Sequence, residues 1–275
     1  MLFNMKHAVK SFVLGLSLLL ANGSIAYAQD LTKGFEAYDN KDYAKALREL
    51  RPLAEQGNSI AQIGLGSMYD AGEGVTQDYK EAMYWYRLAA AQGNAYAQFR
   101  IGFMYNGGEG VTQDYKEAIN WFRLAAEQGY SVAQLHLGLM YDNGRGVTQD
   151  YKEAMNWYRL SAAQDEALAK YNIGLMYDNG RGVTQDYKEA VKWYRLSAAQ
   201  GNVSAQTNLG AMYGNGQGVI KDNVYAHMWF NIAASSGRTN ALKNRDSIAK
   251  IMTAADISKA QDLARECVRK NYKGC

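Results

Sequence analysis

The chain repeats itself with a period of thirty-six residues. Its five tryptophans follow one another at this spacing, at Trp85, Trp121, Trp157, Trp193 and Trp229. The motif VTQDYKEA begins at Val75, Val111, Val147 and Val183, and a degraded copy, VIKDNVYA, begins at Val219. A period of this length is typical of solenoid proteins, in which each repeat buries its apolar face against its neighbours.

Each repeat shows the pattern of two amphipathic helices. In the first, apolar residues such as Ala61, Leu65 and Met68 recur at helical spacing, and in the second a stripe includes Ala82 and Trp85. The second helix of the first repeat is predicted to begin at Asp78, an N-cap residue, with Glu81 completing a capping box. Gly93 supplies a left-handed stop, as do Gly57, Gly129 and Gly201 at equivalent places.

Two departures from ordinary helix composition carry structural predictions. Gly66 and its counterparts Gly102, Gly138, Gly174 and Gly210 lie inside the first helices, where glycine costs about 1 kcal/mol relative to alanine. We expect the partner helix to approach closely there, at a distance that a side chain would block. At the end of the third repeat Asp165 replaces the stop glycine, and it is expected to adopt the left-handed conformation.

The recurring motifs A-x-x-x-L-G-x-x-Y, G-x-G-V, D-x-x-x-A-x-x-W-Y and A-A-x-Q-G resemble the Sel1-like repeat family, which is related to the tetratricopeptide repeat. The resemblance implies an all-α fold, a right-handed α-solenoid of antiparallel helix pairs with a concave inner surface. It covers five repeats, at 59–94, 95–130, 131–166, 167–202 and 203–238.

The segments that flank the repeats are expected to be caps. Residues 29–58 resemble a tetratricopeptide-type unit, in which Pro52 should bend a helix. Residues 239–275 form a C-terminal helical cap of two amphipathic helices, with Ile251 and Val268 among their apolar residues. Charged residues on the outer face would keep this end of a solenoid in water.

Residues 1–28 have the features of a signal peptide. Lys6 and Lys10 precede an apolar run, and cleavage is expected between Ala28 and Gln29. A retained membrane anchor is the alternative, but about ten apolar residues are too few to span a bilayer. The protein is therefore expected in the periplasm or outside the cell, without stable membrane insertion. Removal of Lys6 and Lys10 lowers the formal net charge from +3 to +1, which argues against nucleic acid as a partner.

The two cysteines, Cys267 and Cys275, lie at the C-terminal end. In an exported chain an even pair suggests a disulfide, here closing a short loop. The alternative, a metal site, lacks further ligands, because His136 and His227 are isolated and distant in sequence.

The segment DNGRGVTQDYKEA, from Asp142 to Ala154, is repeated letter for letter from Asp178 to Ala190. An EF-hand loop needs side-chain oxygens at positions 3 and 5 and a glycine at position 6. Gly144, Gly146 and Val147 occupy these positions. The segment is predicted to be a joint between two helices, and no metal or cofactor is expected.

Ser247 and Lys250 form an S-x-x-K sequence, the spacing found in serine β-lactamases and penicillin-binding proteins. Cysteine-rich members of the resembled family have been associated with β-lactam binding and hydrolysis. The accompanying K-T-G and S-D-N motifs are missing, as are cysteines within the repeats. We therefore predict no enzyme, with a β-lactam-binding or β-lactamase-like hydrolase as the alternative.

The residues that differ between repeats are the candidates for binding. In the tetratricopeptide register, the inward-facing positions of the first helices are apolar or aromatic in the middle repeats. The candidate partner-binding residues are Tyr96, Phe99, Phe103, Leu135, Leu139, Tyr171 and Leu175. Such a surface suits an extended or helical peptide, although some of these side chains could fill the core instead. Asp142 and Asp178 would lie at its rim.

These features together predict a monomeric, exported, non-enzymatic scaffold that binds a protein or peptide on its concave face. The resemblance implies roles such as assembling envelope complexes or tuning a membrane-bound partner from outside the cytoplasm. Attachment to peptidoglycan or another glycan is a further alternative, since tyrosines could stack on sugars.

Overall fold

The computed structural model describes residues 22–275, and this part of the chain is built of helices and turns without strands. The all-α expectation is therefore confirmed. The signal peptide expected at 1–28 lies largely outside the described residues. The first described helix, α2 (Asn22–Asp39), runs across the expected cleavage site. Within residues 22–275, no helix is both long enough and apolar enough to cross a membrane.

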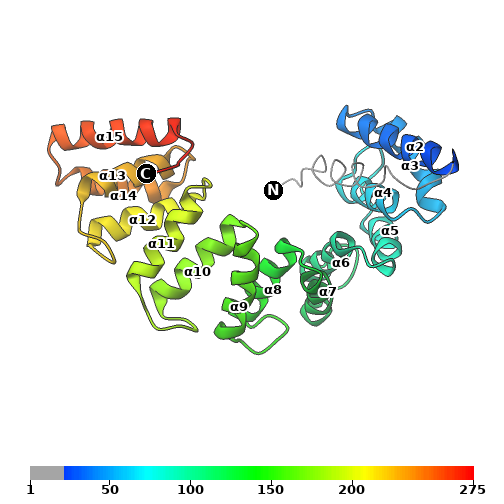
Figure 1. Cartoon of the computed structure of the whole chain (residues 1–275), viewed down its shortest axis with the longest axis horizontal. Coiled ribbons are helices and arrows are strands. Elements are labelled where there is room, and N and C mark those ends of the chain that lie inside the picture. The colour runs from blue at the N-terminus through cyan, green and yellow to red at the C-terminus, as the bar shows by residue number, and fades with distance from the viewer. Residues whose placement is uncertain (1–21) are drawn as a thin grey trace. The chain divides into compact units, whose positions relative to one another are not determined.

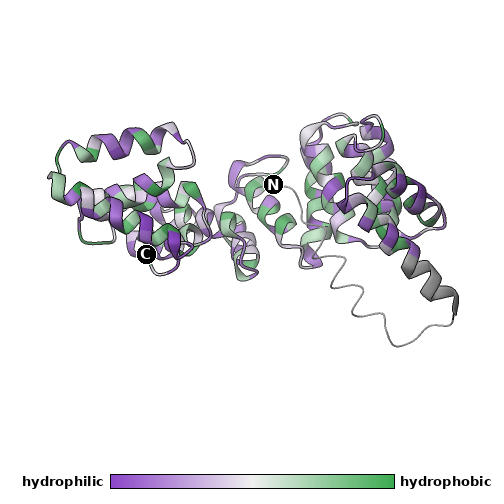
Figure 2. Cartoon of the chain, turned by 90° about the horizontal axis from the view of Figure 1, so that it is seen from above, coloured by the Kyte–Doolittle hydropathy of each residue, from purple (hydrophilic) through white to green (hydrophobic). Residues whose placement is uncertain are grey.

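The chain divides into two compact units, with the boundary between Gln113 and Asp114. In the first unit, α2 is followed by α3 (Tyr43–Glu55), α4 (Ser59–Ala71), α5 (Tyr79–Ala91) and α6 (Ala95–Gly107). The second unit contains α7 (Tyr115–Glu127), α8 (Ser131–Asn143), α9 (Tyr151–Ala163), α10 (Ala167–Asn179), α11 (Tyr187–Ala198), α12 (Val203–Asn215), α13 (Asn223–Ala234), α14 (Thr239–Ala249) and α15 (Ala254–Arg269). Within each unit consecutive helices pack on one another as far as α14, and α15 packs on α13 (Figure 1). Polar and apolar residues alternate along the helices, as expected of elements buried on one side (Figure 2).

The second helix of each repeat begins at an aspartate, as predicted. The Asp78 carboxylate accepts hydrogen bonds from the backbone N–H groups of Lys80 and Glu81, at 2.9 and 3.2 Å. The prediction that Glu81 completes a capping box is wrong, however. The backbone N–H of Asp78 donates to the carbonyl of Tyr69 at 2.9 Å, so it is already satisfied without the Glu81 side chain. The same bond joins Asp150 to Tyr141 at 3.0 Å and ties the start of the second helix to the end of the first.

The predicted left-handed stops are present. Gly93 and Gly201 have φ of 83° and 81°. Asp165, which replaces the glycine at the end of the third repeat, has φ of 69° and keeps the turn. The strained aspartate is held by an ion pair with Lys170.

The glycines inside the first helices make room for aromatic rings. A Cβ added to Gly66 would lie 2.7 Å from the ring of Tyr86. The corresponding distance is 2.6 Å from Gly138 to Tyr158. The rings of Tyr86 and Tyr158 are fully buried. The expected close approach is therefore confirmed, and it is made by a side chain of the second helix in the same repeat.

Hydrogen bonds between successive repeats fix how they stack. In the second unit an arginine of each of the helices α7, α9 and α11 donates to a tyrosine hydroxyl eighteen residues later. These pairs are Arg123–Tyr141 at 3.0 Å, Arg159–Tyr177 at 3.2 Å and Arg195–Tyr213 at 2.6 Å. Because the same contact recurs at every step, each repeat is added in the same register as the one before.

Helix α15 explains the degraded fifth copy of the motif. It packs on α13, as Figure 1 shows at the C-terminal end. The α13 side chains Tyr225, Met228 and Ile232 replace Glu189, Lys192 and Leu196 of the previous repeat. Ile232 is 3% exposed, whereas Leu196 is 50% exposed. The outer face of the last repeat has become apolar where the C-terminal helix covers it.

Two expectations about the caps need revision or qualification. Helix α14 ends before Ile251, which is 69% exposed, and Val268 of α15 is 48% exposed, so neither belongs to the core. Pro52 lies inside α3, which continues beyond it to Glu55. The neighbouring Leu50 and Leu53 are buried, and the N-terminal cap packs through them.

Candidate partner-binding surface

The predicted residues of the first unit lie on α6 and differ in exposure. Phe99 is only 7% exposed, whereas Tyr96 and Phe103 are partly exposed. The ring centroids of Phe99 and Phe103 are 6.1 Å apart, and that of Tyr96 lies 6.5 Å from Tyr86. Phe99 therefore supports the surface from below, and Tyr96 and Phe103 contribute to it.

An arginine and an aspartate are paired beside these rings. The Arg100 guanidinium forms an ion pair with Asp70, and both side chains are largely buried. The same guanidinium lies 5.4 Å from the ring centroid of Phe103 and 5.7 Å from that of Tyr86. The Tyr86 hydroxyl also donates to Asp70 at 3.2 Å. The negative charge of Asp70 is thus neutralised inside the first unit.

The predicted residues of the second unit come from α8 and α10. Leu135 is 4% exposed and packs in the core, whereas Leu139, Tyr171 and Leu175 are partly exposed. The Tyr171 ring centroid lies 5.9 Å from that of Tyr194 on α11. Of the seven candidate residues, Phe99 and Leu135 are the two that offer a partner almost no area.

Two aspartates lie on the same helices as these residues. The hydroxyl of Tyr158 donates to Asp142 at 3.1 Å, and that of Tyr194 donates to Asp178 at 3.0 Å. Burial, together with the neighbouring aspartate charge, raises the pKa of both tyrosines. The hydroxyls therefore stay protonated and act as donors.

Comparison of the repeats shows that tyrosine and aspartate occur together. Tyr86, Tyr158 and Tyr194 occur in the repeats that have Asp70, Asp142 and Asp178. Where the aspartate is replaced by Asn106 or Gly214, the ring residue is Phe122 or Phe230. A buried hydroxyl needs an acceptor, and phenylalanine removes that need. The sequence alone contains this correlation, and it could have predicted the hydrogen bonds between these tyrosines and aspartates.

The loop from Asp142 to Ala154 is a structural joint, as the sequence predicted. Gly144 ends α8 with φ of 64°, and Gln149 donates to the carbonyl of Asp142 at 2.7 Å. A Cβ on Gly146 would lie 2.5 Å from the carbonyl oxygen of Tyr115, so the loop packs against the start of α7. No group of three or more potential metal ligands occurs in residues 22–275.

Ser247 and Lys250 lie at the end of α14, and both are exposed. Neither side chain is enclosed by other residues in a way that would exclude water from a covalent reaction.

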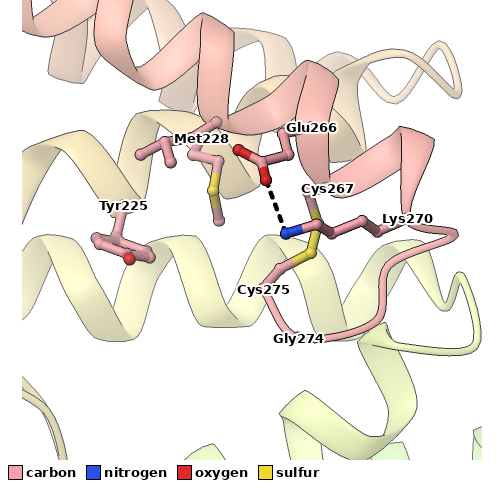
Figure 3. Close-up of a pocket in the computed structure, with 8 residues that line it drawn as sticks. Tyr225, Met228, Glu266, Cys267, Lys270, Gly274 and Cys275 are labelled. Carbon is pink, nitrogen blue, oxygen red and sulfur yellow. Dashed lines mark ion pairs between the residues drawn. A yellow bond between two sulfur atoms is a disulfide. The ribbon is translucent and has the colours of Figure 1, made fainter.

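The predicted disulfide is present. Cys267 and Cys275 are bonded, with their Cα atoms 5.6 Å apart. The bond borders a shallow pocket whose floor includes Met228 of α13, and Glu266 and Lys270 form an ion pair of 2.7 Å at its edge (Figure 3). The C-terminal residues are thereby fastened to α15.

The fold defines a helical-repeat protein, in which recurring buried residues such as Gly138 and Met140 build the scaffold. A model of the Sel1 repeat matches residues 59–94, 95–130, 131–166, 167–202 and 203–237. The chain belongs to the Sel1 repeat family. Proteins of this family generally mediate contacts between proteins, and their fold is typically a non-enzymatic scaffold.

Several solved structures are similar to this chain, among them the following two. The crystal structure of a Sel1 repeat protein from Oxalobacter formigenes is 34% identical, with a TM-score of 0.75, and the match covers 87% of this chain and 99% of that one. The crystal structure of c5321, a protective antigen present in uropathogenic Escherichia coli strains that displays an SLR fold, is 28% identical with a TM-score of 0.58. That match covers 90% of this chain and 62% of the other. None of the curated proteins matches the chain in sequence.

Proposed function

We propose that this protein is an exported, non-enzymatic scaffold that binds a protein or peptide through the first helices of its repeats. The observation that carries the proposal is the contrast between constant and varying positions. Residues that recur in every repeat, such as Gly138 and Met140, are buried in contacts that build the scaffold. Leu139, Tyr171 and Leu175 do not recur in every repeat and are partly exposed.

Export is supported by the basic and apolar N-terminal sequence and by the disulfide, since such bonds persist in oxidising compartments. The expected mature chain begins at Gln29. N-terminal sequencing of the protein recovered from the periplasm or the medium tests this point. A chain that stays in the cytoplasm and keeps its first residues would contradict it.

Site-specific photocrosslinking tests the binding surface. A photoreactive phenylalanine derivative at Tyr171 should give a discrete covalent adduct with a partner in intact cells. The matched control is the same derivative at Leu160, which is 50% exposed on the second helix α9. Adducts of equal yield from both positions, or none from Tyr171, would argue against binding through the first helices.

A further inference from the structure

The second unit carries two aspartates whose charge is not neutralised within the described chain. Asp142 and Asp178 occupy equivalent positions on α8 and α10, thirty-six residues apart. Each accepts a hydrogen bond from a neutral tyrosine hydroxyl, and neither forms an ion pair with any residue in the range 22–275. The equivalent Asp70 of the first unit is paired with Arg100.

Asn172 occupies the position next to Asp142 that Arg100 occupies next to Asp70. Asn172 follows Asp142 by thirty residues, the spacing at which Arg100 meets Asp70. The Asn172 side chain is 7% exposed, and its Nδ2 atom has no hydrogen-bond partner in the described structure. Asp142 Oδ1 is also buried without a partner. Buried polar atoms nearly always find partners. Asp142 Oδ1 is an acceptor and therefore fits a hydrogen-bond donor that the described chain does not supply, and the uncharged Asn172 leaves the charge of Asp142 unbalanced where Arg100 balances that of Asp70.

Apolar side chains accompany both carboxylates. Leu139 precedes Asp142 by three residues, and Leu175 precedes Asp178 by three, so each pair shares one face of its helix. Tyr171 lies on the same helix as Leu175 and is partly exposed. We call these residues the Asp142–Asp178 surface: Leu139, Asp142, Tyr171, Leu175 and Asp178.

Arg238 is a cation close to Tyr171 of this surface. Burial raises the pKa of the Tyr171 hydroxyl, and the positive charge of Arg238 partly offsets this rise. None of the ion pairs formed within residues 22–275 joins Arg238 to Asp178. Arg238 therefore does not neutralise the charge of Asp178 through an ion pair, as Arg100 does for Asp70.

We propose that the Asp142–Asp178 surface binds a basic, apolar segment of a partner protein. Lysine or arginine side chains of the segment meet the two carboxylates, and its apolar side chains pack on Leu139, Tyr171 and Leu175. The inference rests on the proposed function and names the chemistry of the partner. Complementary charge would also select against acidic segments.

Labelled synthetic peptides provide the test. One alternates lysine with leucine, a second alternates glutamate with leucine, and a third alternates serine with leucine. Fluorescence anisotropy with the full chain should show binding of the lysine peptide, with affinity falling as salt is added. The other two peptides should bind at least about tenfold more weakly.

Charge-removing variants locate the binding. Asp142→Asn with Asp178→Asn keeps an acceptor for each tyrosine hydroxyl and should reduce the affinity for the lysine peptide to that for the serine peptide. Glu117→Gln with Glu153→Gln removes the same two charges from the second helices α7 and α9 and should leave the affinity unchanged. Circular dichroism confirms that both double variants remain folded.

The Arg100–Asp70 ion pair suggests a substitution that should block peptide binding at Asp142. Asn172→Arg should create beside Asp142 the pairing that Arg100 makes with Asp70 and weaken lysine-peptide binding several-fold. Equal binding by the original chain, the Asp142/Asp178 variant and the Asn172 variant would overturn the inference. If the Tyr171 photocrosslink then persists, partner binding stands and only the basic chemistry is wrong. Loss of affinity in the Glu117/Glu153 control to the same degree would likewise overturn it, because net charge alone would then govern binding.

Discussion

The ring of Tyr194 occupies the space that a side chain at Gly174 would need, since a Cβ on that glycine would lie 2.5 Å from the ring. The same ring carries the hydroxyl that donates to Asp178 at 3.0 Å. One residue of a second helix thus fills the gap in the first helix and holds a carboxylate at the surface. Core packing and surface charge are coupled through this tyrosine.

Gly174→Ala should destabilise the protein by about 1–3 kcal/mol, because the ring of Tyr194 must shift to admit the methyl group. Gly214→Ala is the matched control. Its Cβ would meet nothing closer than 3.4 Å, and alanine favours the helix, so stability should stay constant or rise. Urea unfolding measures both. Equal effects of the two substitutions would show that the close approach does not constrain the fold.

Ile232→Ala should cost about 2–4 kcal/mol, since the side chain is buried where α15 covers α13. Leu196→Ala removes a similar side chain from the equivalent, half-exposed position and should change stability by less than about 0.5 kcal/mol. Thermal and urea unfolding of the two variants provide the comparison. A small loss for Ile232→Ala would mean that α15 adds little to the stability of the last repeat.

The stability of the fold should fall as the pH is lowered from 6.5 towards 4, in part because of His136. Burial lowers the pKa of His136 from 6.5 to about 4, so in this interval the unfolded chain takes up a proton that the folded chain does not. The contribution of neutral His136 to the free energy of unfolding is fully present above pH 6.5, and at most about 3 kcal/mol is lost as the pH falls to 4.

His136→Asn places at this position the residue found at Asn172 and Asn208, and it should flatten this part of the stability profile. His227, whose pKa is also lowered by burial, remains in the variant and contributes in the same direction. Urea unfolding at several pH values measures the difference. Parallel profiles for the variant and the original chain would show that His136 titrates normally in the folded state.

Reduction of the disulfide should loosen the C-terminal end and lower stability by about 2–3 kcal/mol, as expected for closing a short loop. Hydrogen exchange should accelerate in residues 254–275 and stay constant in residues 59–94. The Cys267→Ala, Cys275→Ala double variant should resemble the reduced protein and be insensitive to reductant. Faster exchange throughout the chain would contradict a local role for this bond.

The sequence predicted most of the scaffold because the scaffold is what recurs. The caps at Asp78 and Asp150, the space at Gly138 and the left-handed turn at Asp165 all follow from local backbone and packing rules. The prediction that Glu81 completes a capping box was wrong. The capping-box rule considers only residues of one helix, whereas the N–H of Asp78 donates to the carbonyl of Tyr69 in the previous helix. That contact depends on how the two helices meet.

The binding surface was harder to predict. The tetratricopeptide register placed Phe99 and Leu135 with Tyr96 and Leu139, yet the first two are buried and the last two are partly exposed. Positions three and four residues apart lie on the same side of a helix but not at the same depth, and only the neighbouring helices decide which of them is covered. The pairing of Arg100 with Asp70 joins residues thirty positions apart and has no local signature.

The apolar face of α13 beneath α15 closes the array at its C-terminal side. A further unit placed after α13 would meet a helix already seated there, whereas a unit copied between existing ones would find the same arginine and tyrosine contacts on both sides. The chain can therefore lengthen from within while its ends stay as they are. The identical segments from Asp142 and from Asp178 have the form that such copying leaves, and each copied unit of this kind brings another carboxylate to the surface.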